Sequence, residues 1–307
     1  MYDVSIIIVN WNTRELLAKC LRCVQETIQQ VSYEVFVVDN ASTDGSQELV
    51  RQEFPAVRLI ANAENVGFAR ANNQAMQVAQ GRYILLLNSD AFVKPGTVDT
   101  MVQFMDAHPE AGLSACKLLY EDGRLQRSCA SFPTLATELY IALGLDKLFP
   151  RSPIFGAYQM TDWDYGDTRE VDVIMGAFML ARAEAVQQVG LLDEQFFMYS
   201  EEVDWCYRFQ RAGWKTYFHP QAEAIHLWGG SSRAIKTESL IRLYRARVQF
   251  FRKHYGGFQA GLYKALLGLN AVVRIGPGAV YYLTRAGADS RQKHQAFCQL
   301  LKAIPSF

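Results

Sequence analysis

Several features of exported or membrane-spanning proteins are missing from this 307-residue sequence. It has no run of about 18 apolar residues, which excludes an obvious membrane-spanning helix. Its N-terminus has no basic region followed by an apolar one, so we expect no secretory signal peptide. It also lacks internal repeats and low-complexity segments. Its length fits one large globular domain, or one domain with an appendage.

Cysteine is sparse and forms no clear metal-binding pattern. The six cysteines are scattered. Cys20 and Cys23 have C-x-x-C spacing, but no second pair completes a zinc site. Both fall in a helical apolar pattern, which favours small core residues over a redox or metal role. This usage fits a reducing, cytoplasmic setting.

The sequence carries no formal net charge, because 31 Lys and Arg balance 31 Asp and Glu. The balance hides an asymmetry, since residues 233–307 contain thirteen Lys and Arg against two acids, Glu238 and Asp289. The C-terminal region is therefore about +11 and the rest of the chain about −11. A basic, aromatic and apolar region on an acidic body suggests a surface that meets something anionic.

Apolar runs that alternate with helical patterns predict a sheet of parallel strands. We expect strands at residues 4–9, 34–39, 57–60 and 83–87, and helices capped by Thr13, opened at residues 44–46, and spanning residues 67–80 up to Gly81. Strands that alternate with helices form doubly wound sheets, and ligands bind beyond the carboxyl ends of their strands. The side chains at these ends are polar: Asn10, Asp39, Asn62 and Asp90.

The second half of the chain is less regular. We expect helices from Pro95–Gly96 to His108, at 182–189 and at 239–254, and strands at 113–120, 173–181, 215–219 and 222–226. Residues 121–172 are rich in aromatics, Pro and Gly and predict a long loop over a site.

Two acidic positions indicate chemistry. Glu201, Glu202 and Asp204 fall in the first turn of an apparent helix, where ionised acids are favoured by the helix dipole alone. Asp90 ends a buried apolar strand, a common position for a carboxylate that holds a metal or a substrate. Together the two sites suggest metal-dependent group transfer with a carboxylate base.

Several stretches, in this order, resemble the family 2 glycosyltransferases, which are inverting enzymes with a GT-A fold. The matching stretches are Val4–Asn12, Val37–Ser46, Asn65–Asn73, Leu86–Asp90, Gly176–Ala177, Glu201–Asp204 and His226. Within that family the chain looks most like bacterial rhamnosyltransferases. The resemblance covers residues 3–235 and implies an α/β fold of GT-A type, with a Rossmann-like doubly wound mixed sheet in residues 1–235. Residues 236–307 would form a basic, amphipathic helical extension.

The implied reaction explains the acidic residues. Attack of a sugar hydroxyl on the anomeric carbon of a nucleotide sugar releases a diphosphate, whose charge a divalent cation (Mn or Mg) stabilises. A base on the opposite side must take the hydroxyl proton, and direct displacement then inverts the configuration.

By resemblance, Asp90 is the last acid of a metal-binding triplet. The triplet here reads Asn88-Ser89-Asp90, so a metal would be held mainly by the diphosphate, Asp90 and water. His226 matches a histidine that ligates the metal in some relatives. The alternatives are a strand-ending turn for Asp90 and a structural role for His226.

Glu202 aligns with the family's catalytic base, which is usually Asp. A Glu reaches about one methylene further and can make the same proton transfer. Glu201 or Asp204 remains an alternative base. Arg208, four residues after Asp204, is expected to form an ion pair with it.

The nucleotide should bind beside Asp39, where relatives accept the N3 hydrogen of uracil or thymine, so UDP or dTDP is favoured. An Asx-turn at Asp39 is compatible with this role. Further donor contacts are expected from Asn10, Asn12, Asn65, Arg70, Asn73 and Asn88, several of which could equally be helix caps or surface residues. Trp11, Trp163, Trp205 and Trp228 could stack on sugar, although buried Trp is usually core.

The basic C-terminal region favours a membrane surface. Its bases alternate with Tyr, Phe and Leu, as in interfacial helices: Arg242, Arg245, Arg247, Arg252, Lys253, Lys264 and Arg274. The resemblance implies a lipid-linked or polysaccharide acceptor and a peripheral location at the inner face of the cell membrane. A solvated helical face or an oligomer interface remains possible, and no motif points to nucleic acid.

The leading hypothesis is transfer of L-rhamnose from dTDP-rhamnose, with inversion. A UDP-sugar-dependent transferase of the same fold, or a nucleotide-sugar-binding module without transfer activity, is the alternative. A sugar-1-phosphate nucleotidyltransferase is disfavoured, because the turn at Asn10–Thr13 lacks the expected Gly-rich loop.

Overall fold

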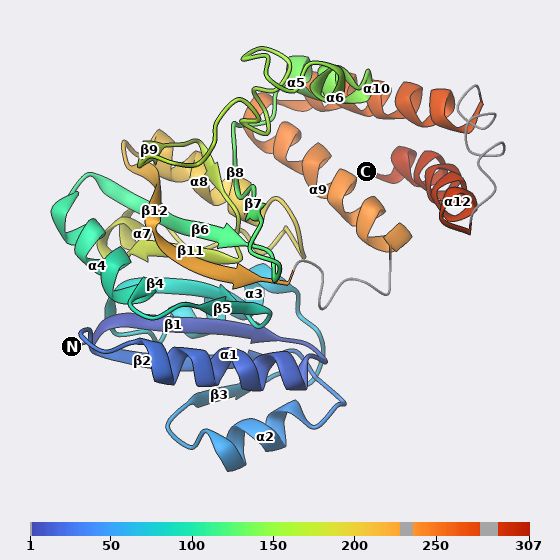
Figure 1. Ribbon diagram of the computed structural model, residues 1–307. Coiled ribbons are helices and arrows are strands. Elements are labelled where there is room, and N and C mark those ends of the chain that lie inside the picture. Colours follow the sequence, from blue (N-terminus) through green and yellow to red (C-terminus); the bar gives the residue numbers. More distant parts are fainter. Residues whose placement is uncertain (1, 228–235, 277–287) are drawn as a thin grey trace. The chain divides into compact units, whose positions relative to one another are not determined.

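A computed structural model describes residues 2–227, 236–276 and 288–307, which form two compact units (Figure 1). The sheet unit consists of Met1–Phe132, Trp163–Phe197 and Glu201–Ser231. The helical unit consists of Pro133–Asp162, Met198–Ser200 and Ser232–Phe307. The predicted domain boundary after residue 235 falls at the end of residues 228–235, which are not among the described residues. Residues 133–162 belong to the helical unit rather than to the sheet unit.

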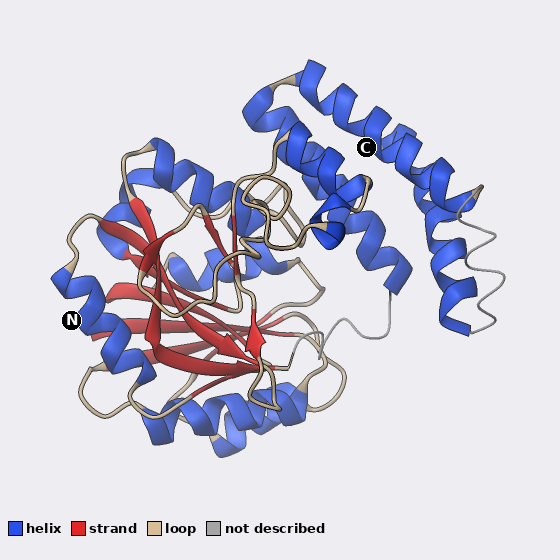
Figure 2. Cartoon of the chain, turned by 45° about the horizontal axis from the view of Figure 1, so that its top comes forward, coloured by secondary structure: helices blue, strands red, loops and turns tan. Residues whose placement is uncertain are grey.

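The sheet unit is built on a mixed, ten-stranded sheet (Figure 2). Along it lie β3 (Arg58–Ala61), β2 (Tyr33–Asp39), β1 (Tyr2–Asn10), β4 (Gly81–Asn88), β11 (Phe178–Arg182), β6 (Ala111–Leu119), β12 (Lys215–His226) and β5 (Ala91–Val93), with β7 (Leu125–Gln126) on β6 and β9 (Arg169–Glu170) on β12. Strands β1 to β4 are parallel, whereas β11 runs antiparallel to β4 and β6. A separate antiparallel pair joins β8 (Cys129–Ala130) to β10 (Val173–Ile174). The expected mixed sheet is confirmed.

Helices cover both faces of this sheet, as a doubly wound fold requires. They are α1 (Arg14–Thr27), α2 (Ser46–Glu53), α3 (Phe68–Met76), α4 (Thr97–Ala107), α7 (Ala183–Val189) and α8 (Glu201–Arg211). One hydrophobic core joins α1, α2 and α4 to alternate residues of β1, among them Ile6 and Ile8. Figure 1 shows α1 in front of the sheet and α3 behind it. Because β1 is covered on both faces, its apolar run is continuous.

Three expected element boundaries are wrong. Gly81 does not close α3, which ends at Met76, but opens β4, where an added Cβ would lie 2.4 Å from the Ser5 backbone nitrogen. The strand expected at 173–181 is broken into β10 and β11. The two strands expected at 215–219 and 222–226 are one, β12, with a register irregularity between His219 and Glu223.

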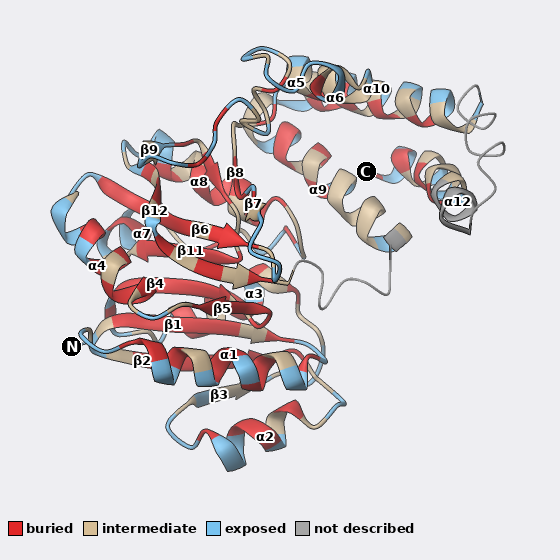
Figure 3. Cartoon of the chain, in the orientation of Figure 1, coloured by how far each residue is buried: buried red, intermediate tan, exposed pale blue. Residues whose placement is uncertain are grey.

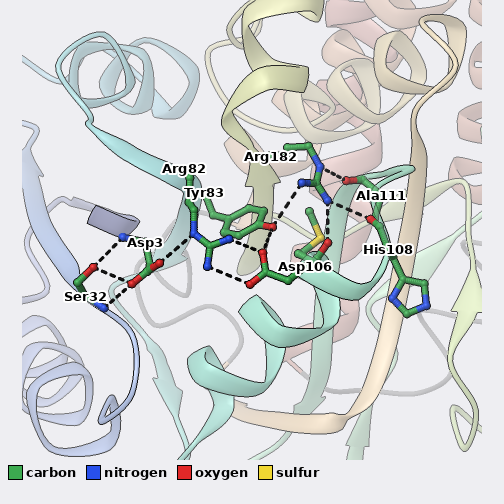
Figure 4. Close-up of polar contacts among 9 residues, drawn as sticks. Asp3, Ser32, Arg82, Tyr83, Asp106, His108, Ala111 and Arg182 are labelled. Atoms are coloured by element: carbon green, nitrogen blue, oxygen red, sulfur yellow. Dashed lines mark hydrogen bonds and ion pairs between the residues drawn. The ribbon is translucent and has the colours of Figure 1, made fainter. Parts of the chain in front are cut away.

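A polar network closes the amino-terminal edge of β4 (Figure 4). Arg82 pairs with Asp3 at 2.9 Å and with Asp106, whose carboxylate also accepts a hydrogen bond from the Tyr83 hydroxyl at 2.7 Å. Arg182 donates to three backbone carbonyls at and beyond the end of α4. The charges at this edge satisfy one another, which leaves the carboxyl ends of the strands as the place for a ligand.

The helical unit contains α5 (Leu135–Ala142), α6 (Leu145–Leu148), α9 (Lys236–Tyr255), α10 (Gly257–Ile275), α12 (Ala288–Ala303) and the 3-10 turn η1 (Ile304–Ser306). The long loop expected at 121–172 therefore holds two helices and several short strands. Among the described helices, none combines the length and the apolar character needed to cross a bilayer.

Three bases of the C-terminal region bind partners within the helical unit. The Arg247 side chain is 12% exposed and donates to Glu138 of α5 and to the Tyr158 hydroxyl, at 2.6 Å in each case. Its expected place on an exposed basic face is therefore wrong, because α5 supplies a buried carboxylate opposite it. Arg252 and Lys264 each donate to the Phe307 backbone oxygen at 3.0 Å.

Candidate active site

The expected nucleotide residues Asn10, Asn12 and Asp39 meet beyond β1 and β2. The buried Asp39 carboxylate accepts hydrogen bonds from Asn10 Nδ2 and Gln47 Nε2, both at 2.8 Å, and from the Ser42 backbone nitrogen at 2.9 Å. The bond to the Ser42 nitrogen is the expected local turn, so the turn coexists with any ligand role. Asn12, at φ 53°, accepts from the Thr43 backbone nitrogen at 2.8 Å and fixes the neighbouring loop.

Asn10 supports this cluster through its side-chain hydrogen bonds. Its amide nitrogen donates to Asp39 and to the Ser42 hydroxyl, and its oxygen accepts from the Thr13 hydroxyl at 2.6 Å. All of its polar atoms thus serve protein partners, which orients the Asp39 carboxylate. Thr13 occupies the N-cap position of α1, as expected, but its side chain makes no capping hydrogen bond, because its hydroxyl is used here. The Asp44 carboxylate accepts instead from the Arg14 nitrogen at 2.8 Å.

A second cluster forms where β4 ends and β12 returns. Asp90 and His226 are both buried, and Asp90 Oδ1 lies 3.3 Å from His226 Nε2. Asn88 Nδ2 lies 3.5 Å from the same ring nitrogen. A carboxylate oxygen and an imidazole nitrogen this close together can bind one cation.

Gln126 sets the tautomer of His226. Gln126 Oε1 lies 2.8 Å from His226 Nδ1, while its Nε2 donates to the His226 backbone oxygen at 3.4 Å. The amide therefore presents its oxygen to the ring, so Nδ1 can donate to it, and Nε2 faces Asp90. This is the arrangement found behind metal-ligating histidines. Gln126 is fully buried.

The start of α3 is held by a close backbone approach. Gly67 has φ 86°, and a Cβ there would lie 2.5 Å from the Phe197 backbone oxygen, which accepts from the Phe68 nitrogen at 2.8 Å. The expected close approach at Gly67 is confirmed. Asn65 closes the preceding turn by accepting from the Gly67 nitrogen at 3.0 Å.

Two other polar residues of α3 bind protein partners. Asn73 is buried, and its side chain donates to the Leu192 oxygen and accepts from the Leu192 nitrogen. Arg70 is exposed, and its Nε lies 3.9 Å from Glu194 Oε2. The structure thus gives Asn73 an internal role and leaves Arg70 at the surface beside an acid.

The three acids of α8 differ sharply in environment. Asp204 is fully buried and pairs with Arg208 Nε at 2.8 Å, which confirms the expected ion pair. Arg208 in turn donates to backbone oxygens of the segment before α8. Glu201 is buried, whereas Glu202 is partly exposed. Of the three, Glu202 alone is not classed as buried.

The backbone entering α8 is strained. Tyr199 and Ser200 have φ of 73° and 66°, a region that costs free energy for residues other than glycine. Such conformations occur at functional sites, where the surrounding structure holds them. Both residues directly precede the first turn of α8 in the chain.

Burial raises the pKa of the Glu201 carboxyl well above its usual range, and the neighbouring Glu202 charge adds to the shift. The native state therefore binds more protons than the unfolded chain above the unfolded pKa of 4.5. The stability that this group contributes is present below that pH and is lost as the pH rises through the folded pKa.

Replacing Glu201 with Gln should reduce this pH dependence. We expect the free energy of unfolding of the variant, relative to the parent, to increase by about 1–3 kcal/mol from pH 5 to pH 8, because the parent must ionise a buried group. Thermal unfolding across that pH range measures the difference. Parallel stability profiles for parent and variant would contradict the assignment.

A run of contacts within the sheet unit links Glu202 to Asp90. A Cβ built on Gly176 would lie 3.9 Å from Glu202 Cβ. The next residue, Ala177, accepts at its backbone oxygen from the Asn88 nitrogen at 3.1 Å. Asn88 in turn approaches His226, the neighbour of Asp90. The base candidate and the metal-ligand candidates therefore lie at the same end of β4.

The tryptophans expected to stack on sugar differ in how far they are buried. Trp205 is fully buried and donates to the Gly190 oxygen, and Trp163 is buried against Tyr165, with ring centroids 4.1 Å apart. Trp11, just beyond β1, is 37% exposed. Trp228 lies outside the described residues. Trp11 is thus the one described candidate with an accessible ring.

Some features of the site were not anticipated. Within the described residues, no group of three or more His, Cys, Asp or Glu could hold a metal, so Asp90 and His226 would be joined by other ligands. Gln126 could not be identified from the sequence, because nothing in the spacing of residues 126 and 226 indicates that they pair.

Residues 5–188 match the model of the family described as Glycosyl transferase family 2. A Mycobacterium tuberculosis protein named N-acetylglucosaminyl-diphospho-decaprenol L-rhamnosyltransferase is 29% identical over 247 residues, which cover 76% of this chain and 80% of that protein. Rhamnosyltransferase WbbL of Escherichia coli is 28% identical over 233 residues, covering 73% and 83%.

Solved structures share the fold. The mannosyltransferase PcManGT of Pyrobaculum calidifontis, in complex with GDP-Man and Mn2+, superposes with a TM-score of 0.60 at 18% identity, covering 99% of this chain and 86% of that one. TarS of S. aureus gives a TM-score of 0.53 at 14% identity, covering 97% and 49%. The expected GT-A type of fold is confirmed.

Proposed function

Because the chain belongs to glycosyl transferase family 2, we propose that it moves L-rhamnose from dTDP-rhamnose to a hydroxyl of a lipid-linked or polysaccharide acceptor, with inversion. The names of the M. tuberculosis and E. coli relatives support the choice of sugar. The observation that carries the proposal is the run of contacts from Glu202 to Asp90, since the reaction needs a base and an anion-stabilising group at one centre.

In this proposal Glu202 is the general base. It accepts the proton of the acceptor hydroxyl as the new bond to the anomeric carbon forms and the bond to the diphosphate breaks. We choose Glu202 because it is only partly buried, whereas Glu201 is buried and Asp204 is held by Arg208.

Asp90 Oδ1 and His226 Nε2 would hold the divalent cation, and their separation of 3.3 Å fits two ligands of one ion. Bound there, Mn2+ or Mg2+ supplies positive charge to the leaving diphosphate. The Mn2+ in the structure of the mannosyltransferase supports a metal in this fold. The diphosphate and water would complete the ligand set, because two protein ligands are too few.

Gln126→Leu should weaken metal binding by about 10–100-fold, because His226 loses the acceptor that fixes its tautomer. Titration of Mn2+ in the presence of dTDP, followed by electron paramagnetic resonance, measures the affinity. Gln126→Glu keeps an acceptor at the same place and should retain most of it. Unchanged Mn2+ affinity in a folded Gln126→Leu variant would contradict this role for Gln126.

Asp39 would accept the N3 hydrogen of the nucleobase, which favours thymine or uracil over bases without that donor. The hydrogen bonds from Asn10 and Gln47 fix the carboxylate for this contact. Trp11 and Asn12 directly follow β1, and Asn65, Arg70 and Asn88 are the further donor contacts we propose. A UDP-sugar donor is the alternative that this pocket also fits.

The acceptor is proposed from the M. tuberculosis relative, whose name contains a diphospho-decaprenol. A polyprenol-linked acceptor resides in a membrane, so the enzyme would work as a peripheral protein at the membrane's inner face.

A panel of dTDP-, UDP- and GDP-sugars with Mn2+ tests the proposal through slow hydrolysis of the donor in the absence of acceptor. We expect dTDP-rhamnose to be consumed fastest. Preference for a UDP-sugar would support the alternative donor. A protein that binds a donor but hydrolyses and transfers none would be a binding module, and the proposal would be wrong.

A further inference from the structure

Exposed apolar side chains concentrate in the helical unit. Of the fourteen large apolar side chains that are exposed among the described residues, ten belong to this unit. They are Leu139, Leu143, Leu148, Phe149, Ile154, Phe258, Leu262, Leu269, Val272 and Val273. Figure 3 shows the exposed positions along α10 and beside α5 and α6. A cluster of this kind on a folded unit marks an interaction surface.

Helix α10 is apolar on two opposite faces. One face, formed by Ala260, Tyr263, Leu267 and Ala271, is buried in the helical unit. The other contains Phe258, Leu262, Leu269 and Val273, which recur at helical spacing and are 44–81% exposed. A helix that is apolar all round is normally covered on all sides. Because α10 does not qualify as a membrane span, its exposed face needs a covering surface.

The segment Lys147–Ile154, which begins in the last turn of α6, continues this character. Leu148, Phe149 and Ile154 are 68%, 48% and 60% exposed, and the neighbouring bases Lys147 and Arg151 are exposed as well. Within the unit, α5 joins this region to α10, because Asn270 Nδ2 donates to the Ala142 backbone oxygen at 3.2 Å. The segment and α10 together contain four bases and no acid.

The charge pattern decides between possible occupants. A second copy of the chain would place the same bases opposite one another in a symmetric contact, which is unfavourable. Apolar side chains that alternate with bases and lack acids match the headgroup region of an anionic bilayer. A lipid-linked acceptor, taken from the proposed function, would also bring the protein to such a surface.

We propose that α10 and the Lys147–Ile154 segment form a lipid-binding surface, with the exposed apolar side chains inserted among the headgroups of an anionic bilayer and Lys147 and Arg151 paired with lipid phosphates. The inference rests on the proposed function only for the choice of lipid over a protein partner. Lys147 and Arg151, rather than Arg247 of α9, would be the bases that contact lipid.

Sedimentation of the full chain with vesicles tests this surface without any sugar nucleotide. We expect binding to vesicles that contain phosphatidylglycerol, weaker binding to phosphatidylcholine alone, and loss of binding as salt is raised. Leu148→Ser/Phe149→Ser and Leu269→Ser/Val273→Ser should each lower the partition coefficient by about ten-fold or more, since apolar area is lost. Lys147→Glu/Arg151→Glu should remove the preference for anionic lipid.

Val78→Ser is the matched control, because Val78 is a 45% exposed apolar residue of the sheet unit. It should bind vesicles like the parent, and circular dichroism should show that every variant is folded. The proposal would be overturned if both apolar-to-Ser double variants bound vesicles like the parent. It would also be overturned if the parent did not bind anionic vesicles. Variants that dissociate an oligomer while vesicle binding persists would identify a self-association face instead. Failure of the donor panel leaves this measurement unaffected.

Discussion

Replacing Glu202 with Gln should lower the rate of sugar transfer by about 10²–10⁴-fold while leaving donor affinity nearly unchanged. Gln keeps the size of the side chain but cannot accept the hydroxyl proton. The donor is held by other groups, so binding of dTDP to the variant, measured by calorimetry, should match the parent. Transfer is measured with a saturating donor, so that the loss appears in kcat.

Two neighbouring variants show whether the loss belongs to this carboxylate. Glu202→Asp should keep part of the activity, because it retains the base but shortens its reach. Glu201→Gln should retain most transfer activity, since Glu201 is buried beside the base rather than exposed to an acceptor. Full activity in Glu202→Gln, or its loss only in Glu201→Gln, would assign the base to a different acid.

Much of the sheet unit could be predicted because its signals are local. The apolar runs of β1 and β2 are continuous because these strands are buried on both faces. The hydrophobic pattern and the length of each run are enough to predict a strand. The break between β10 and β11 could not be predicted, because the apolar run through residues 173–181 continues across it. Helix α5 had a weak signal in Thr134 and Thr137, which form a reciprocal cap without the usual Glu or Gln.

The candidate site was predictable where each residue carries its own signal. Asp39 and Asp90 follow buried strands, and the acids of α8 open a helix. Their mutual arrangement depends on pairings between distant strands, such as β11 with β4, which places Ala177 beside Asn88. Gln126 and Asn10 act through hydrogen bonds to other side chains. Such partners are fixed by tertiary contacts and leave no periodic pattern in the sequence.

The burial of Arg247 has the same origin. On α9 its spacing indicates an exposed basic stripe, and the sequence gives no sign that Glu138, more than a hundred residues away, lies opposite. Because Arg247 pairs with Glu138 inside the helical unit, other residues form the surface of that unit. For this reason the charge count of the C-terminal region does not tell which of its bases are exposed.

Replacing Asp90 with Asn should lower transfer by at least about a hundred-fold and raise the Mn2+ concentration needed for half-maximal activity by about ten-fold or more. Asn keeps the shape and the contact with the segment around β12, but it removes the negative charge. Since the described residues supply no third His, Cys, Asp or Glu to this cluster, the remaining ligand His226 would have to hold the ion with the diphosphate and water.

Asp122→Asn is the matched control for this change, because Asp122 lies at an exposed turn and pairs only with the neighbouring Arg124 in the described contacts. It should leave both the rate and the Mn2+ dependence unchanged. Mn2+ binding to each protein, measured with dTDP present and without transfer, separates a lost metal site from a lost fold. If Asp90→Asn bound Mn2+ like the parent, the cation would be held without Asp90. Asp90 would then be a strand-ending turn residue.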